Sequence, residues 1–173
     1  MRVQEHIKLS AAAAIIAAPW LKQDVVIPFA SSILIDVDHY LWHAITYRTL
    51  SLRAAVRFYL QADPPPAIKY FHHPLFLGLL LFLAVRLRSR LLGLILAGLL
   101  FHASLDIIHN TQMSRLKYTL SEQAHHLCSE CGQYVDALQL HTVHFTSNLL
   151  DRYNPRHFVV LCPRCHERAH RHS

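Results

Sequence analysis

The chain has little charge, few cysteines and few glycines. Only 16% of its 173 residues are charged and its mean hydropathy is +0.21, which together exclude a disordered chain. Its 4 cysteines are too few for a disulfide scaffold at this length. The sequence has no internal repeat and no linker rich in glycine and serine. With 53% hydrophobic residues, it can bury the core of one sizeable domain or of two small ones.

Histidine, by contrast, is abundant, with 15 residues in the chain. Histidine is the commonest metal ligand and the usual proton carrier near neutral pH, so its excess points to metal or proton-transfer sites. Residues 1–109 hold 10 basic and 6 acidic side chains, and residues 110–173 hold 7 and 5. Neither half is a strongly basic nucleic-acid arm, so charge alone identifies no partner.

The composition changes once along the chain. All cysteines come after residue 127, and all long apolar runs come before residue 110. We therefore expect a helical domain over residues 1–109, a connector or short linking helix over 110–126, and a small cysteine-containing domain over 127–173. The predicted fold class is mainly α.

Apolar stretches over residues 5–18, 25–47, 75–85 and 91–108 predict the helices, with an amphipathic basic helix over 50–61. Pro19 is expected to end the first, and Pro28 to break the second. Residues 75–85 are short for a membrane span, which needs about 20 residues, and residues 91–108 are nearly long enough. A soluble bundle is one alternative. We favour membrane association, because continuous apolarity leaves little polar face, with the basic residues of segment 86–90 against anionic lipid.

Acids and histidines interrupt these apolar stretches. Asp36-Val37-Asp38-His39 lies between Ile33-Leu34-Ile35 and Tyr40-Leu41-Trp42, and His102 and Asp106 lie four apart in the last stretch. Such groups are costly in an apolar interior unless something pairs with them. Helical bundles build metal sites from side chains of this kind. Alternatively, Asp36 and Asp38 cap a helix, and His43 and His109 lie on polar faces.

The ordered segments His6–Ser10, Asp36–His39, His72-His73 and His102-x-x-x-Asp106 resemble the motifs of predicted inner-membrane metal-dependent hydrolases. That family is distantly similar to zinc phospholipase C, which implies two or three metal ions and hydrolysis of phosphoesters. Ile68 stands where the third motif would have its first histidine, and Ile35 replaces a proline. The resemblance implies a ligand cluster of His6, Asp36, Asp38, His39, His72, His73, His102 and Asp106.

Two Cys-x-x-Cys pairs give the strongest signal in the chain. Cys128 and Cys131 form the first pair, and Cys162 and Cys165 form the second. Two thiolate pairs on tight turns predict a closed tetrahedral zinc site, which favours a reducing compartment. Residues 135–140 and 158–161 are predicted as short strands between the pairs.

The segments Leu140–His144, Asn154–His157 and His166–His170 resemble, with the cysteine pairs, an HNH endonuclease domain that carries a four-cysteine zinc site. The resemblance implies a ββα-metal fold. His141, His166 and His170 would hold a second divalent ion, Zn, Mg, Mn or Ni. Thr142 replaces the usual catalytic histidine and has no group that titrates near neutral pH. The candidate catalytic residues are therefore Thr142, the substitute base His144, and His157 at the usual asparagine position.

Together, these patterns predict a metal-dependent hydrolase of phosphate esters. It would act as a phosphodiesterase or endonuclease through the HNH-like domain, and the helical domain would tether it to the membrane. The expected partners are a membrane, a phosphoester substrate and nucleic acid. The expected location is the inner or plasma membrane, with the zinc domain facing the cytoplasm. The alternative is a catalytically degenerate, membrane-anchored zinc module that binds nucleic acid or a protein.

Overall fold

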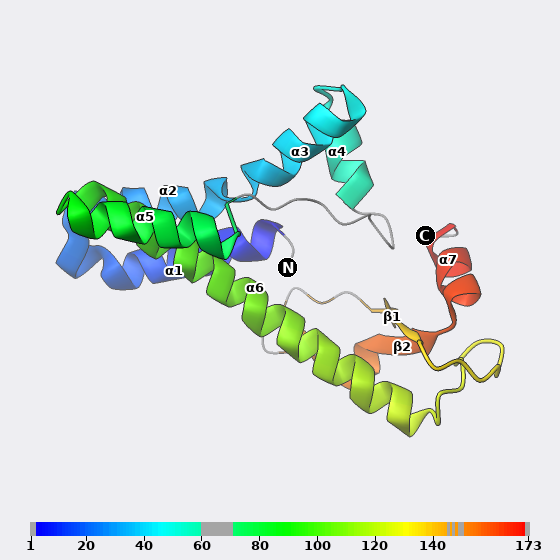
Figure 1. Ribbon diagram of the computed structural model, residues 1–173. Coiled ribbons are helices and arrows are strands. Elements are labelled where there is room, and N and C mark those ends of the chain that lie inside the picture. Colours follow the sequence, from blue (N-terminus) through cyan, green and yellow to red (C-terminus); the bar gives the residue numbers. More distant parts are fainter. Residues whose placement is uncertain (1–2, 60–70, 145, 147, 149–150, 172–173) are drawn as a thin grey trace. The chain divides into compact units, whose positions relative to one another are not determined.

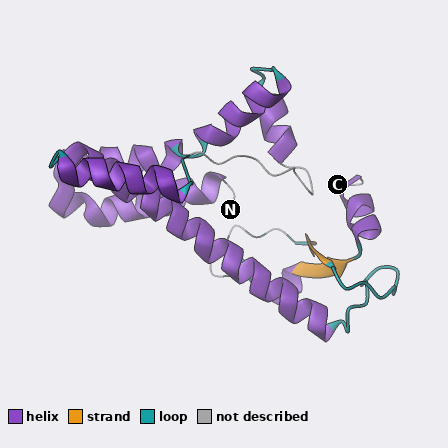
Figure 2. Cartoon of the chain, in the orientation of Figure 1, coloured by secondary structure: helices purple, strands orange, loops and turns teal. Residues whose placement is uncertain are grey.

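The computed structural model describes residues 3–59, 71–144, 146, 148 and 151–171. These residues are mostly helical and contain one sheet of two short strands, as Figure 2 shows. They divide into two compact units, the first up to Ile108 and the second from His109 onward. The expected mainly α class is confirmed.

The first unit is built from helices, which Figure 1 labels along the chain. In order they are α1 (Val3–Leu21), the short η1 (Lys22–Val25), α2 (Val26–Leu34), α3 (Val37–Tyr47), α4 (Leu52–Tyr59), α5 (Pro74–Arg86) and the first part of α6 (Arg90–Gln123).

Neither proline acts as the sequence suggested. Pro19 lies inside α1, which ends two residues later at Leu21. Pro28 lies in the first turn of α2, where backbone N–H groups have no partner within the helix in any case. The break in the second apolar stretch comes instead at Ile35 and Asp36, between α2 and α3. This break places Asp36 at the junction of two helices.

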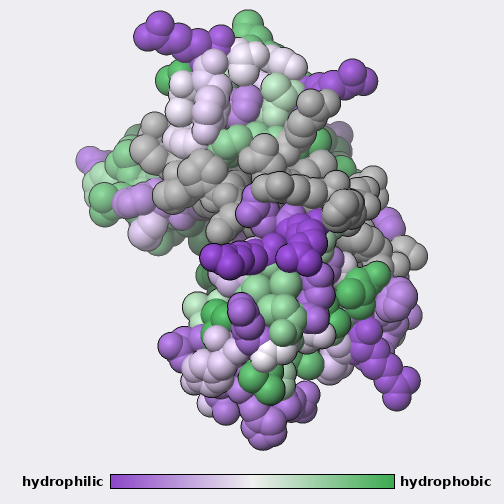
Figure 3. Space-filling view, turned by 90° about the vertical axis from the view of Figure 1, so that its right-hand side faces the viewer, coloured by the Kyte–Doolittle hydropathy of each residue, from purple (hydrophilic) through white to green (hydrophobic). Residues whose placement is uncertain are grey.

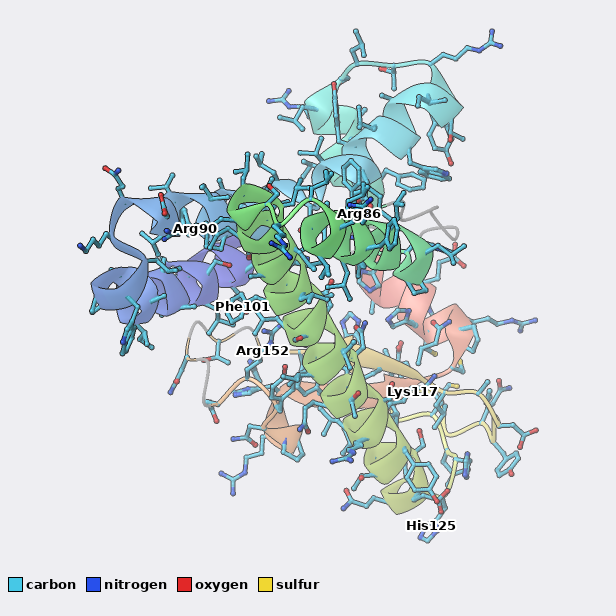
Figure 4. The ribbon with its side chains drawn as sticks, turned by 60° about the vertical axis from the view of Figure 1, so that its left-hand side comes forward. Arg86, Arg90, Phe101, Lys117, His125 and Arg152 are labelled. Carbon is cyan, nitrogen blue, oxygen red and sulfur yellow. The ribbon has the colours of Figure 1, made fainter. Side chains whose placement is uncertain are left out.

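Two turns of the first unit meet at one end. Asp24 in η1 forms an ion pair with Arg90 at the start of α6, with 2.7 Å between Oδ2 and Nη2. The turn from α5 to α6 carries Arg86 and Arg90, labelled in Figure 4, and Arg88 in a left-handed conformation with φ of 47°. Basic side chains therefore gather at this end of the helices.

Helices α2 and α6 approach closely at Gly98. A Cβ atom there would overlap the Pro28 carbonyl oxygen and the Ser31 hydroxyl. The Ser31 hydroxyl also lies 3.2 Å from the carbonyl oxygen of Ile95 on α6, which it can reach as a donor. The absence of a side chain at Gly98 therefore lets the two backbones come together.

Large apolar side chains of the first unit remain exposed. On α5, Leu75, Leu79 and Phe82 are 77%, 56% and 62% exposed, and their spacing puts them on one helix face. Two segments of the described chain, Glu5–Tyr47 and Arg90–Gln123, are helical, long and apolar enough to cross a membrane. The expected membrane association is thus supported only by length and composition.

The second unit contains the last part of α6, β1 (Gln139–Thr142), η2 (Pro155–His157), β2 (Phe158–Leu161) and α7 (Pro163–Arg171). The strands are antiparallel and pair Gln139 with Leu161 and Thr142 with Phe158. The second strand was predicted correctly, whereas the first, expected over 135–140, lies later. Val135 instead bonds through its N–H to the His126 carbonyl, because that segment pairs with the first cysteine turn.

The core of the second unit is small and rich in sulfur. Its buried cluster consists of three apolar side chains and three cysteines, namely Leu138, Val160, Leu161, Cys128, Cys162 and Cys165. Helix α7 carries charged side chains on its exposed side. Figure 3 colours the described residues by hydropathy and shows hydrophilic side chains on the face that it draws. The expected connector over 110–126 is largely the continuation of α6 to Gln123.

Candidate metal centres

A cluster of histidines and aspartates occupies the interior of the first unit. Its members come from α1, the α2–α3 junction, the residue pair before α5, and α6. Seven of the eight predicted residues fall into three overlapping groups, each close enough to hold a metal ion: His6, Asp36 and His102; Asp38, His39 and His72; and His72, His102 and Asp106. Segments far apart in the sequence therefore meet at one site.

Three imidazole nitrogens face two carboxylates at the centre of this cluster. The Nε2 atom of His102 lies 3.4 Å from an oxygen of Asp36 and 3.4 Å from an oxygen of Asp106. His72 Nε2 lies 3.8 Å from each of the same two carboxylates, and His6 Nε2 lies 3.1 Å from Asp106. A tetrahedral zinc ion with ligands at about 2.1 Å places neighbouring ligand atoms about 3.4 Å apart. The distances of 3.4 and 3.8 Å therefore suit ligands of a shared ion, whereas the 3.1 Å contact between His6 and Asp106 is also a hydrogen-bond distance.

The opposite nitrogens of two of these rings are already held. His102 Nδ1 donates to the main-chain carbonyl of Ser32 at 2.7 Å. His72 Nδ1 donates to Asp38 Oδ2 at 3.2 Å, and the same oxygen accepts the Phe71 N–H at 3.1 Å. Such contacts fix the tautomer and the ring orientation of metal-binding histidines. They leave Nε2 of both rings as the atom that points into the cluster.

Part of the cluster is deeply buried, and Asp36, His39, His72 and Asp106 are partly exposed. Asp38 and His102 are 0% exposed and His6 is 3% exposed, and the rings of His6 and His102 stack with centroids 4.0 Å apart. Asp38 also lies 2.7 Å from His39, between Oδ1 and Nδ1. Carboxylates and imidazoles buried among apolar helices need a compensating charge, and a bound cation supplies one.

Two residues, His73 and His43, lie elsewhere than the sequence suggested. His73 is exposed and caps α5, where its Nδ1 accepts the Leu75 N–H at 3.3 Å. Its neighbour His72 is the histidine that enters the cluster. Asp36 lies in the cluster as predicted: it faces His102, and it makes no capping hydrogen bond to α3, which was the alternative. His43 lies neither in the cluster nor on a polar face but is buried against Tyr47 and Phe58. Ile68 lies outside the described residues.

The four cysteines of the second unit form the expected closed group. They are free thiols whose sulfur atoms lie within 4.8 Å of one another, so they could hold a metal ion such as zinc. Cys131 Sγ lies 3.8 Å from Cys162 Sγ, which matches the edge of a tetrahedron with Zn–S bonds of about 2.3 Å. Burial and then the neighbouring thiols raise the pKa of Cys165. Burial also acts to raise the pKa of Cys128, but backbone hydrogen bonds outweigh it and lower the value to about 6.

A second set of ligands lies on β1 and α7. The ring centroid of His141 lies 5.4 Å from that of His166 and 5.0 Å from that of His170, and those two lie 4.7 Å apart. These three predicted histidines form a further group that could hold a metal ion. Burial and the charge of His170 lower the pKa of His141, which favours its neutral, metal-binding form.

The candidate catalytic residues of this unit lie around the end of β1. Thr142 pairs with Phe158 in the sheet, and the rings of His144 and His157 are 6.4 Å apart. His157 Nε2 lies 2.8 Å from Asp151 Oδ2, and the Asn154 amide donates to the other oxygen of Asp151 at 2.8 Å. The hydrogen bonds from Asn154 and His157 lower the pKa of Asp151. Asp151 was not among the predicted site residues, because no motif spacing distinguishes it from other acidic residues.

The described residues thus carry a thiolate group, a histidine triad and a larger cluster of histidines and carboxylates. Comparison of the chain with models of protein families, with curated proteins and with solved structures gave no match.

Proposed function

We propose that the protein is a metal-dependent hydrolase of phosphate esters whose catalytic centre is the histidine–aspartate cluster of the first unit. The observation that carries this proposal is the convergence of Nε2 of His6, His72 and His102 on the carboxylates of Asp36 and Asp106. Asp/His sets of this kind are the donors of two-metal hydrolytic sites.

Each side chain has a role in this proposal. Metal ions bound here would polarise the phosphoryl group and lower the pKa of a bound water. His6, His72, His102, Asp36 and Asp106 would hold the ions. Asp38 and the Ser32 carbonyl would orient His72 and His102 through the other ring nitrogens. His39, whose Nδ1 lies 2.7 Å from Asp38 Oδ1, would be a further metal ligand beside Asp38 and His72.

We propose further that the protein works at the inner or plasma membrane. The exposed apolar face of α5 and the two long apolar segments support this placement. A cytoplasmic side for the second unit is supported by its four free thiols, because thiolate metal sites persist in reducing compartments. The cysteine group would carry a structural zinc ion.

The second unit offers a second candidate activity, cleavage of nucleic acid by an HNH-like site. The triad of His141, His166 and His170 favours it. Thr142 argues against it, because threonine cannot act as a base near neutral pH. The alternative is that this unit only binds nucleic acid or a protein.

The test compares metal content and hydrolysis of 4-nitrophenyl phosphodiesters and of plasmid DNA by the purified full chain. His72→Ala should lower metal content and reduce hydrolysis of the small ester by about 100-fold or more, since even outer contacts of metal ligands contribute 10–100-fold. His73→Ala is the matched control: it changes the adjacent histidine, which lies outside the cluster, and should retain both properties.

His166→Ala separates the two candidate activities. If it abolishes DNA nicking and leaves hydrolysis of the small ester intact, both sites are active. Equal hydrolysis of the small ester by wild type and His72→Ala would contradict catalysis at the cluster.

A further inference from the structure

A cavity of about 190 Å³ lies between α1, α2 and α6 in the first unit. Among the described residues that line it, only Ser10 and Ser32 carry polar side chains. The rest of the lining is apolar and includes Phe29, Leu94 and Phe101, the last of which is labelled on α6 in Figure 4. The cavity is partly open, since Ala97 in its lining is exposed, so an apolar group can enter it from outside.

Small side chains keep this cavity open. Ala13, Ala14 and Ala17 line it from α1, and Ala97 and Gly98 line it from α6. Ala13 and Ala17 are four residues apart and therefore lie on one face of α1. Leucine at the alanine positions of α1 would fill part of the space with little loss of helix propensity. The alanine-rich composition of α1 thus leaves the α1 wall of the cavity mostly without large side chains.

One end of the cavity adjoins the metal-ligand cluster. Ser10 lies one turn after His6 on α1, Ser32 lies one turn before Asp36, and Phe101 precedes His102. The hydroxyls of Ser10 and Ser32 bond to each other at 2.7 Å, and the Ser32 carbonyl accepts from His102. The paired serines therefore stand between the apolar space and the metal ligands.

We propose that this cavity receives the alkyl chain of an amphiphilic phosphoester whose phosphate lies at the cluster. The inference rests on the proposed hydrolase function and names its substrate class. A ligand with a polar phosphate and an unbranched hydrocarbon chain matches a site that is polar at one end and apolar along its length. The exposed apolar residues of the surrounding helices favour a lipid source for such a chain.

The test uses two substrates with the same leaving group, 4-nitrophenyl methyl phosphate and 4-nitrophenyl octyl phosphate. The full chain is held in amphipol, because detergent would compete for the cavity, and the octyl ester is kept below its micelle concentration. Each buried methylene contributes about 0.8 kcal/mol, or about 4-fold. We therefore expect the wild type to prefer the octyl ester in kcat/KM by at least about 10-fold.

Ala17→Phe fills the cavity at a position far along α1 from His6, and it should remove the preference by lowering kcat/KM for the octyl ester to about the value for the methyl ester. Ala12→Phe is the matched control, because Ala12 is exposed on the same helix and does not line the cavity; it should retain the preference. Ala13→Leu serves as a smaller filling change, and circular dichroism and metal content check that each variant is folded.

A binding measurement keeps the two proposals distinguishable. Calorimetry should show that octylphosphonate binds to wild type more tightly than methylphosphonate, and that Ala17→Phe loses the difference. Equal affinity for the two phosphonates, or a preference that folded Ala17→Phe and Ala13→Leu both retain, would overturn the cavity assignment even if the methyl ester is hydrolysed. Tight octylphosphonate binding without hydrolysis of either ester would overturn the hydrolase and leave the chain-binding cavity standing.

Discussion

At the scale of single residues, two kinds of position are unusual. In one, a polar side chain is buried; in the other, the neighbouring backbone leaves no room for a side chain. His102 is fully buried and uses one nitrogen to hold the Ser32 carbonyl and the other to face two carboxylates. Gly98 is the counterpart on the same helix, because the adjacent backbone occupies the space of its missing side chain. Both residues act through atoms of α2, a helix far from them in the sequence.

Gly98→Ala should destabilise the first unit by about 1–3 kcal/mol, since the new Cβ must displace the Pro28 carbonyl or the Ser31 hydroxyl. Gly93→Ala is the control: nothing lies within 4 Å of its added Cβ, and alanine should stabilise α6 there by up to about 1 kcal/mol. Denaturant unfolding followed by circular dichroism measures both changes. Equal effects of the two substitutions would show that α2 and α6 are not in close contact at Gly98.

Much of the cluster was predictable from sequence, because an acid or a histidine inside an apolar stretch is costly and so marks a site. Asp36, His102 and Asp106 could be found in this way. The same reasoning could not choose between His72 and His73, whose difference arises from which residue caps α5. It also missed the Ser32 carbonyl, since every residue has one and no sequence pattern distinguishes it.

At the scale of elements, helix positions followed from the sequence better than strand positions. Residues 75–85 were predicted within a residue of α5, because apolarity and Pro74 define that helix locally. The first strand was misplaced, because the partner of a strand segment is set by distant residues. Val135 belongs to the cysteine turn rather than to the sheet. Helix α6 extends beyond the predicted stretch 91–108 to Gln123, since several residues with good helix propensity continue it.

Helix α5 provides a test of membrane association. With 13 residues it is about 20 Å long and therefore shorter than the ~30 Å hydrocarbon core of a bilayer. Its exposed face nevertheless carries the apolar side chain of Phe82, which a lipid contact would cover. Phe82→Arg should weaken membrane association, because arginine in the hydrocarbon region costs roughly 2.5–3.5 kcal/mol. Tyr118→Arg, at an equally exposed site in the polar part of α6, should not. Detergent-free fractionation measures the distribution, and an identical distribution of both variants would argue against a lipid contact for α5.

At the scale of the whole molecule, metal binding as proposed would have different consequences for the two units. Among the described residues of the second unit, the central buried cluster consists of six side chains, and three of them are cysteines. An apolar core of this size cannot stabilise a small domain without an additional constraint. The first unit, by contrast, consists of helices that contact one another and form their own backbone hydrogen bonds.

Removing zinc, or Cys128→Ser, should therefore make the segment after Gln123 sensitive to protease while most of the helical signal remains. Zinc binding to thiolate sites supplies about 10–16 kcal/mol, which exceeds the usual stability of a domain. His166→Ala removes a ligand of the histidine triad but no thiolate, and should leave the segment resistant. Limited proteolysis with elemental analysis provides the measurement, and a protease-resistant segment in zinc-free protein would contradict a structural role for the ion.

The cysteine group and the histidine–aspartate cluster lie in different units, so the two proposed metal sites would respond differently when metal ions are scarce. Soft thiolates retain zinc, whereas a site of imidazoles and carboxylates accepts several divalent ions and exchanges them more readily. When the supply of metal falls, the histidine–aspartate cluster would empty first, and the thiolate site would keep the second unit folded. On the proposed function, hydrolysis would then stop before the second unit unfolds.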